Sequence, residues 1–269
     1  MPDPAKGFGR MQLGIYTAVE NGSRMAAASW DFIEENILEL LQGELPGEQW
    51  TGLQRSAKSP LPVLAANRLL PPHLKPVGPE FDLPRLQKYM QRIADRAAAV
   101  GMKILVFGSG AARMVPANFD RASAKSQLLE FIRMSVELLT PRGILLVAEP
   151  LNSGECNIMN SVPECMEYVH AVNRPGFQCL VDSYHVWHDH QPLEPIAEAM
   201  PWIKHVHVSD VLDRNVPSEK SPHDYRGFFN MLQTAGYDGP IAVESPTDPC
   251  VLSGPEKIVE FLLKIWPKT

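Results

Sequence analysis

Short apolar segments alternate with longer amphipathic segments along almost the whole chain. The apolar segments are rich in Val, Ile and Leu and carry polar residues mainly at their last positions. This pattern is typical of strands that are buried on both faces of a parallel sheet. We expect strands at Gln12–Thr17, Trp30–Glu34, Pro62–Asn67, Lys103–Gly108, Ile144–Glu149, Gln178–Asp182, Ile203–Ser209 and Ile241–Glu244.

The segments between the strands repeat apolar residues at helical spacing. The clearest, Asp82–Val100, places Leu86, Ile93 and Ala97 on one stripe behind Asp82, which is a suitable N-cap. Residues 42–60 have a weaker pattern, for which we expect a loop and a helix. Further helices are expected at Ala122–Leu139, Val162–Val172, Leu193–Met200, Asp224–Ala235 and Pro255–Ile265.

The regular alternation of strands and helices predicts an α/β fold, a single (β/α)8 TIM barrel. The domain is expected to span residues 1–269, with residues 1–11 as a flexible N-terminal arm. A length of 269 residues agrees with the roughly 250 residues of such a barrel. A doubly wound open sheet is the alternative, but the segment LGIYTAVENG lacks the glycine-rich phosphate motif that usually follows its first strand.

The composition of the chain argues against some classes of binding partner. The chain has 25 Lys and Arg against 31 Asp and Glu, a net charge of −6, which argues against nucleic acid as a partner. No apolar run is long enough to cross a membrane, and the first residues lack the apolar segment of an export signal. We therefore expect a cytoplasmic protein with reduced cysteines that binds a small molecule, and the sequence leaves a homo-oligomer open.

Acidic and imidazole side chains end the last four expected strands. In a parallel barrel these ends meet at one face, where several carboxylates repel one another unless a cation lies among them. We therefore predict a divalent metal site formed by Glu149, Asp182, His207 and Glu244. Three carboxylates and one imidazole suit Mn2+, Mg2+ or Co2+ better than Zn2+.

Other charged and imidazole residues near the strand ends are not expected to bind the metal. His205 faces the same side of its strand as His207 but lies deeper, so we expect it to be packed and hydrogen-bonded. Among the acids after the second strand, we expect Glu34 to contact the substrate, and Glu35 and Glu39 to lie on a solvated face.

The segment VFGSGAARMVP begins at the end of the fourth strand. It contains a run of small residues that is followed by Arg113. Small residues let main-chain N–H groups approach a ligand, and a guanidinium binds a carboxylate or phosphate with two hydrogen bonds. We expect Arg113 to face an anionic or strongly polar end of the substrate. The alternative is a tight turn in which Arg113 caps a helix or pairs with a surface acid.

The phrases EPLN, VDSYH, HVHVSD and VES, in this order at strand ends, resemble the xylose-isomerase-like TIM-barrel superfamily. This group of sugar phosphate isomerases and epimerases includes ketose 3-epimerases, hydroxypyruvate isomerases and inosose dehydratases. The resemblance covers essentially the whole chain. It implies the same four metal ligands and adds substrate-binding positions at Glu155, His185 and Arg214.

The leading hypothesis is a divalent-metal-dependent isomerase or epimerase of a small sugar or similar hydroxy-carbonyl compound. One carboxylate removes a proton next to the carbonyl to give a cis-enediolate, and a second returns it. Glu149 and Glu244 are the expected catalytic pair, because two intervening strands separate them and each can address one face of a flat intermediate. The sequence leaves open which of them abstracts the proton.

Three alternatives differ in reaction class. A metal-dependent dehydratase of a cyclic polyol ketone begins with the same proton abstraction. A non-catalytic sugar-binding barrel uses the same fold without chemistry. A phosphodiesterase of the apurinic-endonuclease type needs several metals and added histidines on early strands, whereas this chain has only His73 before residue 170.

Overall fold

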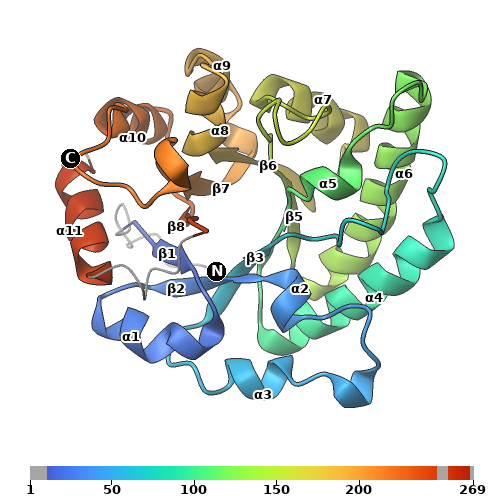
Figure 1. The fold of residues 1–269 in the computed structure, drawn as a ribbon, viewed down its shortest axis with the longest axis horizontal. Coiled ribbons are helices and arrows are strands. Elements are labelled where there is room, and N and C mark those ends of the chain that lie inside the picture. The colour runs from blue at the N-terminus through green and yellow to red at the C-terminus, as the bar shows by residue number, and fades with distance from the viewer. Residues whose placement is uncertain (1–10, 247–253, 267–269) are drawn as a thin grey trace, which may run out of the picture.

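The expected strands form a closed parallel barrel in the computed structural model, which describes residues 11–246 and 254–266. Neighbouring strands pair in chain order, and the last strand pairs with the first. Figure 1 shows the strands at the centre of a ring of helices. Within the described residues the strands are β1 Leu13–Tyr16, β2 Phe32–Asn36, β3 Val63–Asn67, β4 Ile104–Phe107, β5 Leu145–Ala148, β6 Phe177–Asp182, β7 Ile203–Val208 and β8 Ile241–Val243.

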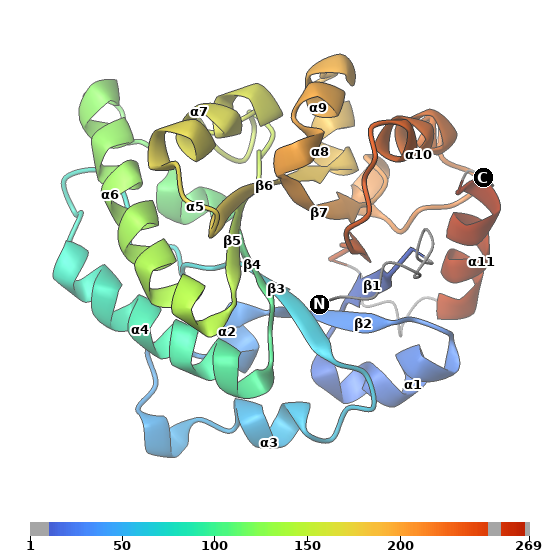
Figure 2. The same cartoon turned by 180° about the vertical axis from the view of Figure 1, so that it is seen from behind.

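Helices follow the strands and surround the barrel, which is also visible from behind in Figure 2. The α-helices of the described part are α1 Gly22–Ala27, α2 Ile37–Leu40, α3 Gly52–Ser56, α4 Leu83–Val100, α5 Gly110–Arg113, α6 Arg121–Leu139, α7 Val162–Val172, α8 Ser183–His188, α9 Glu194–Glu198, α10 Tyr225–Thr234 and α11 Pro255–Ile265. Short 3-10 helices lie at Val19–Asn21 (η1), Gly47–Gln49 (η2), Thr140–Arg142 (η3), Met200–Trp202 (η4) and Leu212–Arg214 (η5).

Helix α4 illustrates how local sequence sets the boundaries. The side chain of Asp82 accepts a hydrogen bond from the main-chain N–H of Arg85 at 3.0 Å and so caps the N-terminus, as expected. Gly101 ends the helix in the left-handed conformation, with φ of 90°, which costs least for glycine. Between them, Leu86 and Ile93 are completely buried against the barrel.

Two apolar cores hold the fold together. The larger one fills the layer between strands and helices. The smaller one lies inside the barrel and consists of Phe32, Ala65, Ile104, Val106, Val147, Leu180 and Ala242. Phe32 fills much of the space opposite Gly14, where a Cβ atom would stand 2.0 Å from the phenyl ring. A glycine in β1 therefore lets one large ring close the floor of the barrel.

A polar layer lies directly above this apolar floor. Side chains two residues apart in a strand face the same side. The residues two positions after the floor residues therefore also face the interior, and five of them are Glu34, Asn67, Glu149, Asp182 and Glu244. In β7 the same two levels are occupied by His205 and His207. The inward-facing positions thus change from apolar to polar along the strands, and the polar groups gather at the carboxyl ends of the barrel.

The structure differs from the expected elements in several places. Strand β2 continues to Asn36 instead of ending at Glu34, and the short helices α1, α2, α5 and α8 were not predicted. The weakly patterned region 42–60 contains η2 and α3. Of the expected flexible arm, residues 1–10 lie outside the described part, and Met11 is buried.

The cysteines add no covalent cross-link to the described part of the fold. Cys156, Cys165 and Cys179 are free and buried, while Cys250 lies outside the described residues. Among the helices that the structure describes, none combines the length and apolar character needed to cross a membrane.

Candidate metal centre and substrate pocket

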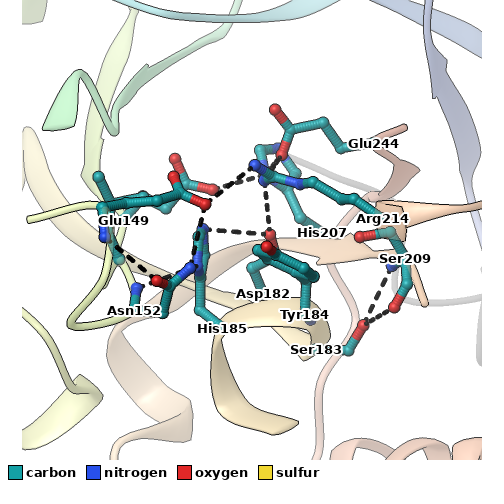
Figure 3. Close-up of polar contacts among 12 residues, drawn as sticks. Glu149, Asn152, Asp182, Ser183, Tyr184, His185, His207, Ser209, Arg214 and Glu244 are labelled. Atoms are coloured by element: carbon teal, nitrogen blue, oxygen red, sulfur yellow. Dashed lines mark hydrogen bonds and ion pairs between the residues drawn. The ribbon is translucent and has the colours of Figure 1, made fainter. Parts of the chain in front are cut away.

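Four side chains from adjacent strands meet at the carboxyl end of the barrel. Glu149 follows β5, Asp182 ends β6, His207 lies in β7 and Glu244 follows β8. One nitrogen or oxygen atom of each lies within 4.8 Å of the corresponding atoms of the others. Figure 3 shows these side chains pointing toward one another. The structure thus brings together the residues that the sequence predicts as a ligand set.

Glu149, Asp182 and His207 are buried and Glu244 is half-buried, and their charges interact strongly. His207 Nδ1 lies 3.0 Å from Glu149 Oε1 and 3.1 Å from Glu244 Oε2. Burial raises the pKa of Glu149, and the charge of Glu244 raises it further. Burial also raises the pKa of Asp182, to about 7, against the opposing effect of Arg214. Buried carboxylates that disfavour each other's ionised form are stabilised by a cation, so this donor set fits a divalent metal ion.

Arg214 reaches into the same cluster from η5. Its Nη2 atom donates hydrogen bonds to Glu244 Oε2 at 2.7 Å and to Asp182 Oδ2 at 3.1 Å. Its guanidinium carbon lies 4.6 Å from the centroid of the Tyr184 ring, which supports the side chain from one face. Burial alone would raise the pKa of Glu244, but the charges of Arg214 and His207 lower it overall.

Glu155 and His185 lie on either side of Asn152. Glu155 is partly exposed, and its Oε1 accepts a hydrogen bond from Asn152 Nδ2 at 3.0 Å. His185 is buried, and its Nδ1 accepts a hydrogen bond from the main-chain N–H of Asn152 at 3.0 Å. Burial lowers the pKa of His185 to about 2, so its ring is neutral and Nε2 carries the hydrogen. That atom lies 3.6 Å from Asp182 Oδ2.

A cavity of about 320 Å³ opens above this cluster. The volume is at the lower end of the range for small-molecule sites. Its polar lining comes mainly from Asn67, Arg68, Ser109, Glu149, Glu155, Arg214 and Glu244. Asn67 donates a hydrogen bond to Glu244 Oε1 at 2.8 Å. Asn67 and Arg68 were not predicted as site residues, although Asn67 ends an apolar strand in the same way as the predicted ligands do.

Arg113 does not have the predicted placement. Its side chain is completely buried, and the guanidinium donates hydrogen bonds to the main-chain carbonyls of Phe107 (2.6 Å), Glu149 (2.6 Å) and Met159 (3.3 Å). A guanidinium with this environment holds strand ends together and has no surface left for an anionic substrate. The predicted substrate contact at Arg113 is therefore wrong, because its side chain is completely buried.

The acids of β2 also differ from expectation. Glu34 is completely buried below the cavity, between His205 and His207, so it is not a substrate contact. Glu35 is buried as well, and its Oε1 accepts a hydrogen bond from the main-chain N–H of Val19 at 2.9 Å. Both errors follow from the longer β2, while Glu39 is exposed as expected and His205 is buried and hydrogen-bonded as expected.

The fold and the site define a parallel barrel with a carboxylate and imidazole cluster at its carboxyl end. The family described as "Xylose isomerase-like TIM barrel" matches residues 69–267, and the chain belongs to this family.

The chain is also similar to individual proteins. L-ribulose-5-phosphate 3-epimerase UlaE of Salmonella paratyphi B is 25% identical over 227 residues, which cover 80% of this chain and 77% of the relative. The structure of 3-keto-D-glucoside 4-epimerase YcjR from E. coli matches 95% of this chain and 100% of its own, with a TM-score of 0.78 and 17% identity. D-allulose 3-epimerase from Methylomonas sp., in complex with D-allulose, matches 96% and 98%, with a TM-score of 0.76 and 19% identity.

Proposed function

We propose that the protein is a divalent-metal-dependent epimerase or isomerase of a small sugar that carries a hydroxyl group next to a carbonyl. The observation that carries this proposal is the position of Glu149 and Glu244, which belong to one four-residue ligand cluster and both line the cavity. The relatives named above, a ketose phosphate 3-epimerase among them, support a sugar as the substrate.

The metal would be held by Glu149, Asp182, His207 and Glu244 and would polarise the carbonyl and hydroxyl oxygens of the substrate. Mn2+, Mg2+ and Co2+ fit this oxygen-rich set better than Zn2+. Glu149 comes from β5 and Glu244 from β8, so the two carboxylates approach the cavity from different sides. In an epimerisation, one removes the proton from the carbon next to the carbonyl and the other delivers a proton to the opposite face.

The remaining polar residues position the substrate in this proposal. Arg214 and Glu155 line the cavity together, with Arg214 Nη1 3.8 Å from Glu155 Oε1, and offer both donors and acceptors to sugar hydroxyl groups. His185 acts from behind the cavity wall, through Asn152 and beside Asp182, rather than from the wall itself. Arg68 adds a second guanidinium to the lining, which suits a substrate with an anionic or strongly polar far end.

A dehydratase of a cyclic polyol ketone is the second candidate, because it begins with the same proton abstraction at the same pair of carboxylates. The two reactions part after this step. Epimerisation returns a proton to the carbon, whereas dehydration expels the neighbouring hydroxyl group.

Proton exchange with solvent tests the proposal. The protein is incubated in deuterated water with Mn2+ and with ribulose 5-phosphate, allulose or an inosose, and NMR follows the proton next to the carbonyl. We expect exchange and an epimer or isomer as product, with Glu149→Gln and Glu244→Gln each slower by about three orders of magnitude or more. The exposed Glu39→Gln serves as control and should match the unaltered protein.

The other outcomes are equally informative. An unsaturated product would favour the dehydratase. Absence of exchange with every substrate and metal would favour a non-catalytic sugar-binding barrel, and near-normal exchange in either glutamine variant would contradict its assigned role.

A further inference from the structure

A buried carboxylate lies next to His207, one of the proposed metal ligands. Glu34 of β2 is completely buried, as are both histidines of β7 that contact it. Its Oε2 accepts a hydrogen bond from His205 Nε2 at 2.6 Å, and its Oε1 lies 2.8 Å from His207 Nε2. A carboxylate this far from solvent is costly to bury unless its partners compensate it, so both contacts are needed to keep it there.

The contact between Glu34 and His207 affects the orientation of the imidazole ring of His207. The two nitrogens of this ring face different carboxylates. Nδ1 lies 3.0 and 3.1 Å from Glu149 and Glu244. Nε2 lies 2.8 Å from Glu34 Oε1 in an ion-pair contact that is not aligned as a hydrogen bond, and neither of these two atoms has a hydrogen-bond partner among the described residues. Nδ1 is therefore the atom that belongs to the ligand cluster. A histidine that binds a metal through Nδ1 must carry its hydrogen on Nε2, and an acceptor at Nε2 fixes both this tautomer and the plane of the ring.

His205 in turn holds Glu34. Besides its hydrogen bond to Glu34, its Nδ1 lies 3.1 Å from the main-chain carbonyl oxygen of Pro240, just before β8. Its ring also packs edge-on against the ring of His207, with centroids 4.9 Å apart. Glu34 is thus fixed from one side by a residue that is itself tied to the main chain.

From these contacts we infer that Glu34 is a positioning residue for the metal centre: it holds His207 with Nδ1 directed at the metal, and His205 supports it from below. The inference rests on the proposed function, because it requires that the four-residue cluster binds a metal. Glu34 itself has no contact with the cavity, so its effect on the reaction would pass through His207.

Metal affinity in a matched pair of variants tests this role. Glu34→Gln removes the charge but little volume, and Glu35→Gln makes the same change one residue further along β2, at a buried carboxylate that binds the main-chain N–H groups of Val19 and Asn36 instead. Mn2+ affinity is measured on each purified protein by competition with a chelating dye, with circular dichroism to confirm folding. We expect about 10- to 100-fold weaker binding in Glu34→Gln and unchanged binding in Glu35→Gln.

A second measurement can already be made on the unaltered protein. In the Co2+-loaded protein, the ring N–H proton of His207 should give a strongly shifted NMR resonance that exchanges slowly with water, because the N–H is buried against Glu34. This resonance should exchange faster in Glu34→Gln than in Glu35→Gln.

Each result bears on the inference separately from the proposed function. Equal Mn2+ affinity in the unaltered protein and Glu34→Gln, or rapid exchange of the shifted proton in the unaltered protein, would overturn the positioning role and leave the metal centre standing. If the unaltered protein binds no divalent ion, the proposed function fails and this inference with it. If Glu34→Gln does not fold, the exchange measurement on the unaltered protein decides.

Discussion

Gly108 leaves the space that the carboxylate of Glu149 occupies: a Cβ atom at position 108 would stand 2.1 Å from Glu149 Oε2. The two residues follow neighbouring strands, β4 and β5. Because residue 108, directly after β4, has no side chain, the carboxylate of Glu149 can lie against the barrel wall. The glycine has an ordinary negative φ, so its requirement comes from this close approach rather than from backbone conformation.

This fit predicts that Gly108→Ala separates function from stability. The methyl group must displace the end of a flexible side chain, which costs the fold little, but the displaced atom belongs to the carboxylate proposed to bind the metal. We expect the free energy of unfolding to change by less than about 1 kcal/mol and turnover to fall by about 100-fold. Gly47→Ala, where a Cβ atom meets nothing within 4 Å, is the matched control. Normal turnover in Gly108→Ala would show that Glu149 acts from another position.

The sequence predicts most of the barrel because the strands of the barrel are buried on both faces and therefore consist of continuous runs of apolar residues. The same logic locates Glu149, Asp182 and Glu244, each of which ends such a run at a position that faces the interior. It also applies to Asn67, which was overlooked because an amide gives a weaker chemical signal than a carboxylate. The structure brings these side chains together, while a bound metal stays a prediction.

Other features depend on contacts between distant parts of the chain. The role of Arg113 is set by the carbonyls of Phe107, Glu149 and Met159, whose common position follows only from the closed barrel. Glu34 was placed at the cavity because the pattern ended β2 two residues early. No local pattern shows that β2 continues, since Glu34 and Glu35 are charged and their burial depends on partners elsewhere.

Arg214→Met should impair substrate binding and turnover but keep the metal. The guanidinium lines the cavity and bridges Asp182 and Glu244, and methionine keeps much of the side-chain length without the donors. We expect kcat/KM to fall by about 100-fold, or about 2.7 kcal/mol of transition-state stabilisation, with Mn2+ content unchanged. Steady-state kinetics and metal analysis of the same preparation check both. A variant that loses its metal would instead make Arg214 part of the support of the ligand cluster.

Arg113→Ala should lower stability strongly. The substitution removes the guanidinium donor from the carbonyls of Phe107, Glu149 and Met159, although those of Phe107 and Met159 still accept main-chain N–H groups. It also removes a side chain that packs over the Phe107 ring, with 5.4 Å between the guanidinium carbon and the ring centroid. We expect a loss of about 3 kcal/mol or more in the free energy of unfolding by urea. The exposed Arg133 donates to a single carbonyl, and Arg133→Ala should change stability by less than about 0.5 kcal/mol. Equal effects in both variants would contradict the structural role of Arg113.

Glu35 should make stability depend on pH in weakly acidic solution. Burial raises the pKa of its carboxyl group from the ordinary value of 4.5 to about 6, partly opposed by the hydrogen bonds from the N–H groups of Val19 and Asn36. Between these two values the folded protein binds more protons at this site than the unfolded chain does, so this contribution to stability is present below about pH 4.5 and is lost as the pH rises through about 6. A difference of about 1.5 pH units corresponds to a loss on the order of 2 kcal/mol. Glutamine cannot titrate, and its NH2 group would face one of the two main-chain N–H donors, so Glu35→Gln lowers stability by an amount that does not depend on pH.

We therefore expect the stability difference between the unaltered protein and Glu35→Gln, measured by urea unfolding at a series of pH values, to shrink as the pH rises from 4.5 to 7. A difference that stays constant or widens over this range would mean that the native carboxyl group of Glu35 does not hold its proton more tightly than the unfolded one.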